Sequence, residues 1–134
     1  MADVLQYGHT GGGARHPFDS RFSMVVINWV ANPFRGDKFE EGWKPAAAAA
    51  TKYGAAAWAL TRSKDDPLSF MQIAVFENKI DFERYWYSEE IAEARIRCAG
   101  WYQVPILPVW FEAVGVGIVS DTIEAPASEP SAAA

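Results

Sequence analysis

Two polar side chains stand in segments that are otherwise apolar, and each could serve a ligand. The first, Asn28, interrupts the β-branched and apolar run 22–31. A buried amide that lacks hydrogen-bond partners costs roughly 1–3 kcal/mol. The residue is therefore either satisfied by a neighbouring strand or a water, or it orients an oxygen atom of a bound molecule. The sequence leaves both interpretations open.

The second is Arg95, which lies at helical spacing from Ile91 and Cys98 on an otherwise apolar face. A guanidinium on such a face requires an anion, because burying an unpaired charge is costly. A structural ion pair with a nearby acid is the favoured interpretation, and binding of an anion or phenolate is the alternative. The acids in question are Glu89, Glu93 and Glu112.

Several common chemistries have no counterpart in the sequence. Cys98 is predicted to be a small core residue, since no nearby histidine could activate it as a nucleophile. No set of histidine, cysteine, aspartate and glutamate residues has the spacing of metal ligands. We therefore expect neither a metal nor another cofactor.

The composition argues against further classes of function. The formal charge is −5 and the basic residues are scattered, so nucleic acid is not expected as a partner. No apolar run approaches the roughly 20 residues of a membrane span. The N-terminus has neither the basic start nor the apolar stretch of a secretory signal. A single cysteine precludes an internal disulfide, and a cytoplasmic protein is expected.

The periodicity of the apolar residues predicts alternating strands and helices. The run 22–31 is a strand that Asn32-Pro33 ends, and Asp37 is expected to cap a helix together with Glu40. The remaining predicted elements are strands at 55–63 and 69–77 that form a hairpin, a helical region from Asn78 with a second start at Ser88, and a strand at 108–119.

The order of these elements, β-α-β-β-α-β, predicts an antiparallel, ferredoxin-like sheet of the α+β class. Residues 21–119 form the predicted domain, preceded by a flexible arm at 1–20 and followed by a disordered tail at 120–134. Apolar residues occupy both faces of the predicted sheet, and the helices can cover only one. A second copy related by two-fold symmetry would cover the other. We therefore expect a homodimer or a higher homo-oligomer.

Three junctions between the predicted elements follow a pattern typical of one superfamily. They are Tyr53-Gly54-Ala55 before the second strand, Thr61-Arg62-Ser63 with Asp66-Pro67 in the hairpin, and Val75-Phe76-Glu77-Asn78 between strand and helix. On these residues the chain resembles the dimeric α+β barrel superfamily, in particular its antibiotic-biosynthesis-monooxygenase-like domains. Such a resemblance implies an architecture more than an activity.

The resemblance implies a range of activities. Members of the superfamily include cofactor-independent oxygenases of polycyclic phenols, haem-degrading oxygenases, lactone isomerases and polyketide cyclases. The haem-degrading branch has an asparagine on the first strand, a tryptophan at the end of the third and a histidine on the second helix. Asn28 matches the first position, Phe76 occupies the second, and no histidine lies between Asn78 and Tyr102. A histidine-ligated haem is therefore not expected.

A ligand cavity is predicted between the sheet and the helices, provided that the face carrying Asn28 turns toward the helices. Alternate strand positions would then line it, and side chains of the second helical region would cover it. A slip of one residue in register would invert the face. The predicted lining is Asn28, Trp58, Gln72 and Phe76, covered by Tyr85, Trp86 and Arg95.

The six tryptophans of this chain are favoured as packing and dimer contacts, with a ligand pocket as the alternative. The leading hypothesis is a protein that binds a small apolar or aromatic ligand. It would act as a cofactor-independent monooxygenase or isomerase on a small aromatic or polyketide-like metabolite. The alternative hypothesis is a non-enzymatic accessory subunit that docks on a larger protein complex.

Overall fold

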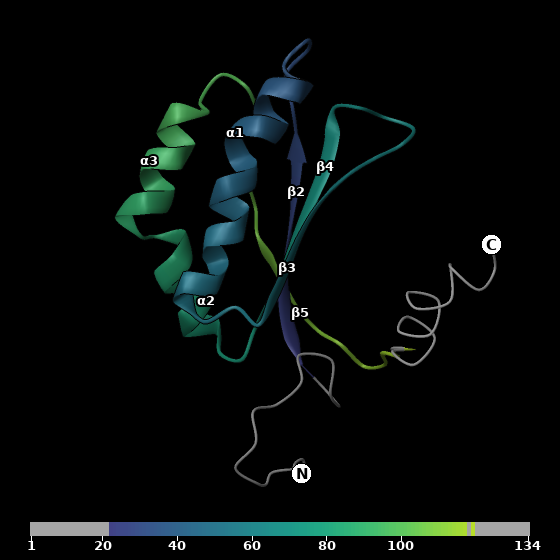
Figure 1. The fold of residues 1–134 in the computed structure, drawn as a ribbon, viewed down its shortest axis with the longest axis vertical. Coiled ribbons are helices and arrows are strands. Elements are labelled where there is room, and N and C mark those ends of the chain that lie inside the picture. The colour runs from purple at the N-terminus through teal and green to yellow at the C-terminus, as the bar shows by residue number, and fades with distance from the viewer. Residues whose placement is uncertain (1–21, 118, 120–134) are drawn as a thin grey trace, which may run out of the picture.

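The computed structural model describes residues 22–117 and 119, which form one antiparallel sheet with helices on one side (Figure 1). The predicted arm at 1–20 and tail at 120–134 lie outside the described residues. The strands are β2 (Ser23–Val30), β3 (Ala57–Arg62), β4 (Ser69–Phe76) and β5 (Val109–Glu112). Their order in the sheet is β3-β4-β2-β5. The predicted ferredoxin-like topology is therefore confirmed.

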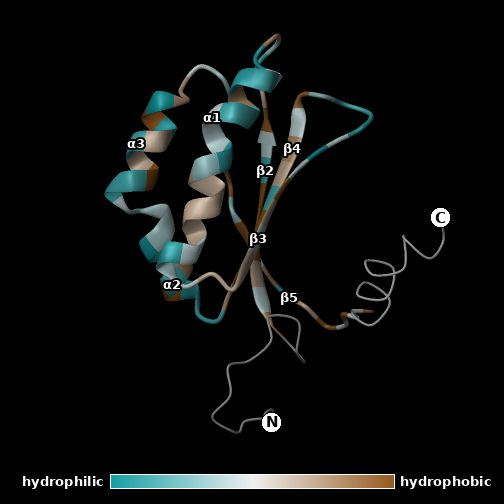
Figure 2. Ribbon diagram, viewed as in Figure 1, coloured by the Kyte–Doolittle hydropathy of each residue, from teal (hydrophilic) through white to brown (hydrophobic). Residues whose placement is uncertain are grey.

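The helices lie together on one face of this sheet (Figure 1). They are α1 (Gly36–Ala48), the 3₁₀ helix η1 (Ala49–Tyr53), α2 (Lys79–Trp86) and α3 (Glu89–Arg97). Figure 2 shows hydrophilic and hydrophobic residues alternating along α3, as expected of an amphipathic helix. The helices bury large side chains against the sheet, among them Phe39, Trp43, Tyr85 and Ile91.

The register between β2 and β4 decides which side chains face the helices. Ile27 lies opposite Gln72, and Asn28 lies opposite Met71. Ile27 and Trp29 are wholly buried, and side chains alternate along a strand, so this set faces the helices. Asn28 and Met71 lie on the other side, which we call the open face. The open face also carries Val26, Val30, Ile73, Val109 and Phe111.

The start of α1 differs from the prediction. The helix begins at Gly36, after Arg35, and no side chain caps it. Asp37 and Glu40 each bind Nη1 of Arg62 instead, at 2.9 and 2.8 Å. The predicted capping pair is therefore wrong, because an arginine from strand β3 takes up both carboxylates.

The second helical region divides where the sequence predicts. Asn78 precedes α2 in an extended conformation, although its side chain makes no capping hydrogen bond. Ser88 precedes α3, and its hydroxyl oxygen accepts a hydrogen bond from the backbone nitrogen of Ile91 at 3.2 Å. The second helix start is therefore confirmed, and Ser88 satisfies one of the amide donors that every helix leaves open at its beginning.

The last strand is shorter than the predicted span of 108–119. It ends at Glu112, shortly before Gly115 and Gly117, and glycine weakens the interior of a strand. β5 nevertheless pairs with β2, so that Val26 lies opposite Val109. The edge of the sheet beside β2 is therefore occupied by the strand that the topology requires.

Candidate functional site

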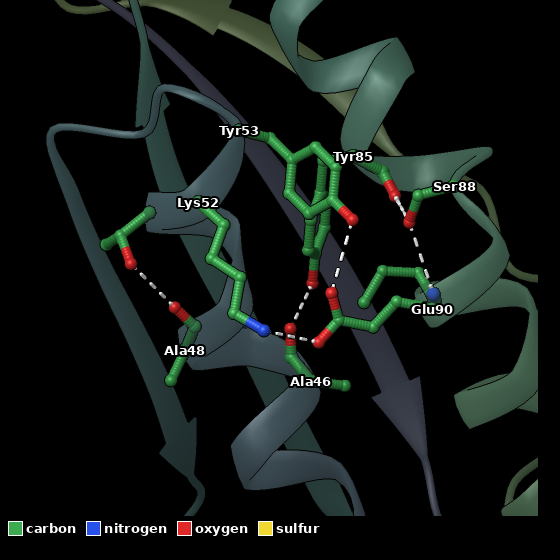
Figure 3. Close-up of polar contacts among 9 residues, drawn as sticks. Ala46, Ala48, Lys52, Tyr53, Tyr85, Ser88 and Glu90 are labelled. Carbon is green, nitrogen blue, oxygen red and sulfur yellow. Dashed lines mark hydrogen bonds and ion pairs between the residues drawn. The ribbon is translucent and has the colours of Figure 1, made fainter.

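A hydrogen-bonded network of side chains lies between the sheet and the helices. The amide oxygen of Gln72 accepts hydrogen bonds from the indole nitrogens of Trp29 and Trp43, at 3.0 and 2.9 Å. The amide nitrogen of Gln72 donates to the hydroxyl of Tyr85 at 3.0 Å. That hydroxyl donates to the carbonyl of Ala46 at 2.7 Å (Figure 3). All four side chains are wholly buried, so the network joins β2 and β4 to α1 and α2.

The directions of these hydrogen bonds follow from the chemistry of the donors. An indole nitrogen can only donate, so the amide oxygen of Gln72 must face both tryptophans and its nitrogen must face Tyr85. That nitrogen carries two hydrogens, and within the described residues only one of them has a partner. A buried donor of this kind costs roughly 1–3 kcal/mol unless a ligand oxygen or a water accepts it.

The phenol of Tyr85 is held in its neutral form. Burial raises its pKa to about 12, and the hydrogen bond with Gln72 and the charge of Arg95 offset that shift only in part. Its hydrogen is already donated to Ala46. Tyr85 therefore cannot serve as a general base near neutral pH, and its role is to position Gln72.

Arg95 lies at the rim of this region, on α3. The sequence favours an acidic partner for it, but the structure places the guanidinium over the ring of Trp86, 4.5 Å from the centroid. Nη1 donates to the carbonyl of Trp86 at 3.0 Å. An arginine has five N–H donors, and within the described residues this is the one hydrogen bond that its side chain makes. Most of its donors are therefore available to an anion.

A second polar cluster lies where η1 meets the start of α3 (Figure 3). One carboxylate oxygen of Glu90 binds Nζ of Lys52 at 2.9 Å, and the other accepts a hydrogen bond from the hydroxyl of Tyr53 at 3.2 Å. The hydrogen bond from Lys52 is the main cause that lowers the pKa of Glu90. The ring of Tyr53 lies 5.8 Å from that of Tyr85, so this cluster adjoins the buried network.

Five of the seven predicted site residues come together in the structure. Gln72 binds Tyr85, whose ring lies 6.2 Å from Phe76 and 6.5 Å from Trp86. Arg95 then stacks on Trp86. The predicted grouping of these five residues between the sheet and the helices therefore agrees with their positions, and their role toward a ligand stays a prediction.

The other two predicted residues lie elsewhere. Trp58 lies opposite Ala74 on the helix-covered face, but at the edge of the sheet, where 38% of its surface is exposed. Asn28 lies on the open face, and its placement in one cavity with Gln72 is wrong. The reason is that β2 is apolar on both faces, so composition alone does not decide which set of residues turns inward.

The sequence indicates no role at the site for five residues that the structure brings there, which are Trp29, Trp43, Lys52, Tyr53 and Glu90. Trp29 and Trp43 bind Gln72 across 43 and 29 positions of the chain. Lys52 binds Glu90 across 38 positions. Contacts at such separations leave no local spacing pattern, so nothing short of the fold itself could have indicated them.

Two further properties concern cofactors and membranes. Over residues 22–117 and 119, no group of three or more histidine, cysteine, aspartate or glutamate side chains could hold a metal ion. None of the helices within the same residues is long and apolar enough to cross a membrane.

The fold is similar to that of solved structures described as antibiotic biosynthesis monooxygenases. A Nitrosomonas europaea protein, provisionally described as an antibiotic biosynthesis monooxygenase, superposes with a TM-score of 0.64 at 15% identity, over 72% of this chain and 94% of its own. SnoaB, a cofactor-independent oxygenase from Streptomyces nogalater, gives 0.61 at 17% identity, over 72% and 96%. Neither a protein-family model nor a curated protein sequence matches this chain. The likeness therefore establishes the fold alone.

Proposed function

We propose that the chain binds a small aromatic or polyketide-like molecule between its sheet and helices and acts on it as a cofactor-independent monooxygenase or isomerase. The observation that carries the proposal is the second amide hydrogen of Gln72. It lies in a wholly buried side chain and has no acceptor among the described residues. An oxygen atom of a ligand would relieve that cost, which is roughly 1–3 kcal/mol.

Arg95 supplies the second contact that such a ligand would need. Its guanidinium is fixed against Trp86 by stacking and by one hydrogen bond, so little conformational entropy remains to be lost on binding. The unused donors match the geometry of a carboxylate or a phenolate. The ring of Trp86 beneath the guanidinium makes the surroundings of this cation apolar, as an aromatic ligand requires.

The described side chains favour a substrate that ionises by itself. Tyr85 stays neutral because burial raises its pKa to about 12, so it cannot remove a proton. A polycyclic phenol carries its own acidic hydrogen, and Arg95 would stabilise the phenolate that remains when this hydrogen is lost to solvent. In the monooxygenase reaction a ring methylene and dioxygen become a carbonyl and water. One oxygen atom forms the carbonyl, and the other leaves as water with both methylene hydrogens.

The same proposal includes a homodimer formed through the open face. That face carries exposed apolar side chains, of which Phe111 and Val109 are 49% and 44% exposed. A second copy would cover them by two-fold symmetry, as expected of closed homo-oligomers. SnoaB and the other solved structures support the fold on which this arrangement depends.

The experiment that tests ligand binding uses an anthrone as the probe, with tryptophan fluorescence and dioxygen uptake as readouts. We expect saturable quenching, and stoichiometric uptake of dioxygen if the chain is a monooxygenase. Arg95→Met should weaken binding at least about tenfold, or 1.4 kcal/mol. Asn28→Leu is the matched control and should bind as the unmodified chain does, because Asn28 lies on the other face. Equal losses in both variants would contradict the assigned site.

A second candidate function is that of an accessory subunit docked on a larger complex. It is favoured by the same exposed apolar residues of the open face, which a different protein could cover as well as a second copy. Light scattering separates the two candidates. A monomer of 14.8 kDa that binds no anthrone would favour the accessory subunit, and a dimer that binds the probe would exclude it.

A further inference from the structure

The aromatic side chains of the core form a chain of neighbouring rings that leads from the centre of the molecule to its surface. The ring of Trp29 lies 4.6 Å from Trp43 and 6.2 Å from Trp86. Trp86 lies 6.5 Å from Tyr85, which lies 5.8 Å from Tyr53. Rings at these separations are in near contact, so their π systems couple electronically. An electron can therefore pass along the series in short steps.

The hydrogen bonds of the tyrosines determine which of them can supply the electron and become the final radical. An oxidised phenol is a strong acid, so a tyrosine gives up an electron readily only when a base accepts its proton. Tyr85 and Tyr102 donate to the backbone carbonyls of Ala46 and Arg95, and a carbonyl oxygen is not a base near neutral pH.

Tyr53 differs from both. Its hydroxyl donates to a carboxylate oxygen of Glu90 at 3.2 Å (Figure 3), and within the described residues it alone among the tyrosines has a carboxylate partner. The side chain is half-buried at the surface, at the outer end of the ring series. Tyr53 is thus the one described tyrosine that combines contact with the core rings and a base for its proton.

From this geometry we infer that the chain conducts oxidising equivalents from its core to Tyr53, with Glu90 as the proton acceptor. In the step, an oxidised Trp86 radical cation gains one electron from Tyr53 and returns to neutral indole. The phenolic proton moves to Glu90, which becomes a neutral carboxyl, and a neutral tyrosyl radical remains.

The physiological oxidant would be an aryloxyl radical, formed when a phenolate ligand at the proposed site gives one electron to dioxygen, which leaves as superoxide. The aryloxyl radical then takes one electron from Trp86 and returns to phenolate, which leaves Trp86 as the radical cation. We call this transfer from Trp86 to Tyr53 the relay. It rests on the proposed function only for the source of its oxidant. If the aryloxyl radical oxidised a core side chain, the relay would transfer the radical to Tyr53 at the surface, where small reductants can reduce it. The core side chains that hold the ligand would be spared.

The test replaces the ligand by azidyl radical, generated by pulse radiolysis, which oxidises indole rings directly. We expect the indole radical to decay into a tyrosyl radical in a first-order step whose rate does not depend on protein concentration. Tyr53→Phe keeps the ring and should abolish that step or slow it at least about tenfold. Tyr87→Phe, which removes a tyrosine that is 76% exposed, is the matched control and should leave the step unchanged.

Two variants test the proton acceptor. Glu90→Gln should slow the step at least about tenfold, because the amide cannot take up the phenolic proton and water is a much weaker base than the carboxylate. Lys52→Met should accelerate the step, because Lys52 holds the pKa of Glu90 down and its loss makes the carboxylate a better base. Persistence of the step in Tyr53→Phe, its loss in Tyr87→Phe, or an unchanged rate in Glu90→Gln would each overturn the relay. Since no ligand takes part, these outcomes are separate from the failure of the proposed function.

Discussion

Gln72 and Asn28 are primary amides on neighbouring strands, displaced by a single position in register, and their surroundings are opposite. Gln72 lies across from Ile27 and is wholly buried, whereas Asn28 lies across from Met71 and is exposed. The first amide is held by two tryptophans and a tyrosine. The chemistry of an amide therefore says little about its role until the face of the sheet is known.

The two faces of the sheet also differ in polarity and in exposure. On the helix-covered face, the one buried polar side chain among the described residues is Gln72, and it orients the large rings around it. The open face is largely apolar and exposed, and in the proposed dimer a second copy would cover it. We expect substitutions on the first face to change the stability of the protomer and substitutions on the second to change its association.

The largest effect is expected from removing the buried amide. Gln72→Leu leaves the indole nitrogens of Trp29 and Trp43 without an acceptor, and each orphaned donor costs roughly 1–3 kcal/mol. The free energy of unfolding should therefore fall by about 2–6 kcal/mol, measured by urea denaturation. Asn28→Leu is the matched control and should stay within about 0.5 kcal/mol. Similar losses in both variants would refute the contrast between the faces.

A smaller effect is expected from titrating Tyr85. Its pKa is raised from 10.0 to about 12 in the folded state, so the unfolded chain loses this proton first as the pH rises. The stabilisation is fully present below pH 10 and is lost between pH 10 and about 12. The loss amounts to at most about 2.7 kcal/mol, at 1.36 kcal/mol for each pH unit.

The melting temperature followed across this range gives the measurement for Tyr85. Tyr85→Phe is the reference, since it lacks the hydroxyl and should show a shallower decline with pH. Tyr87→Phe retains the buried phenol and should follow the unmodified chain. Identical slopes in all three proteins would mean that Tyr85 ionises as freely in the folded state as in the unfolded one.

The smallest effect on protomer stability, and the largest on association, is expected on the open face. Phe111→Lys places a charge among apolar side chains that a second copy would cover, so the particle should fall from a multiple of 14.8 kDa to 14.8 kDa by light scattering. Ile96→Lys adds the same charge at a residue of α3 that is 74% exposed, and it should leave the mass unchanged. A protein that is monomeric without any substitution would remove the basis of the dimer.

The fold could be predicted from the sequence because its signals are local. Pro33 ends the first strand, Ser88 starts the last helix, and the hairpin turns at Asp66-Pro67; each depends on residues a few positions apart. The sequence predicts too long a final strand, because the apolar alternation continues through Gly115 and Gly117. The strand ends earlier, since glycine does not favour a strand interior.

The candidate site could be predicted only in part, for a physical reason. β2 is apolar on both faces, with Val25 and Ile27 on one and Met24 and Val26 on the other, so alternation does not distinguish the inward set. Trp29 decides which face of β2 turns inward. Its ring is large and apolar, and its burial is favourable when the indole nitrogen has a hydrogen-bond partner. That partner is Gln72, 43 positions away, and no spacing rule connects the two.

The sharing of one amide oxygen by two indoles has an optical consequence. Trp29 and Trp43 lie 4.6 Å apart with their planes inclined at 51°, so their electronic transitions mix and the pair absorbs as one chiral unit. Near-ultraviolet circular dichroism, where indoles absorb and the backbone does not, should record this pair as a strong tryptophan signal. Because Trp43 lies on α1 and Trp29 on β2, the signal depends on the packing of α1 against the sheet. It does not depend on the helix content. Spectroscopy on the unlabelled chain can therefore follow the loss of core packing separately from the loss of backbone secondary structure.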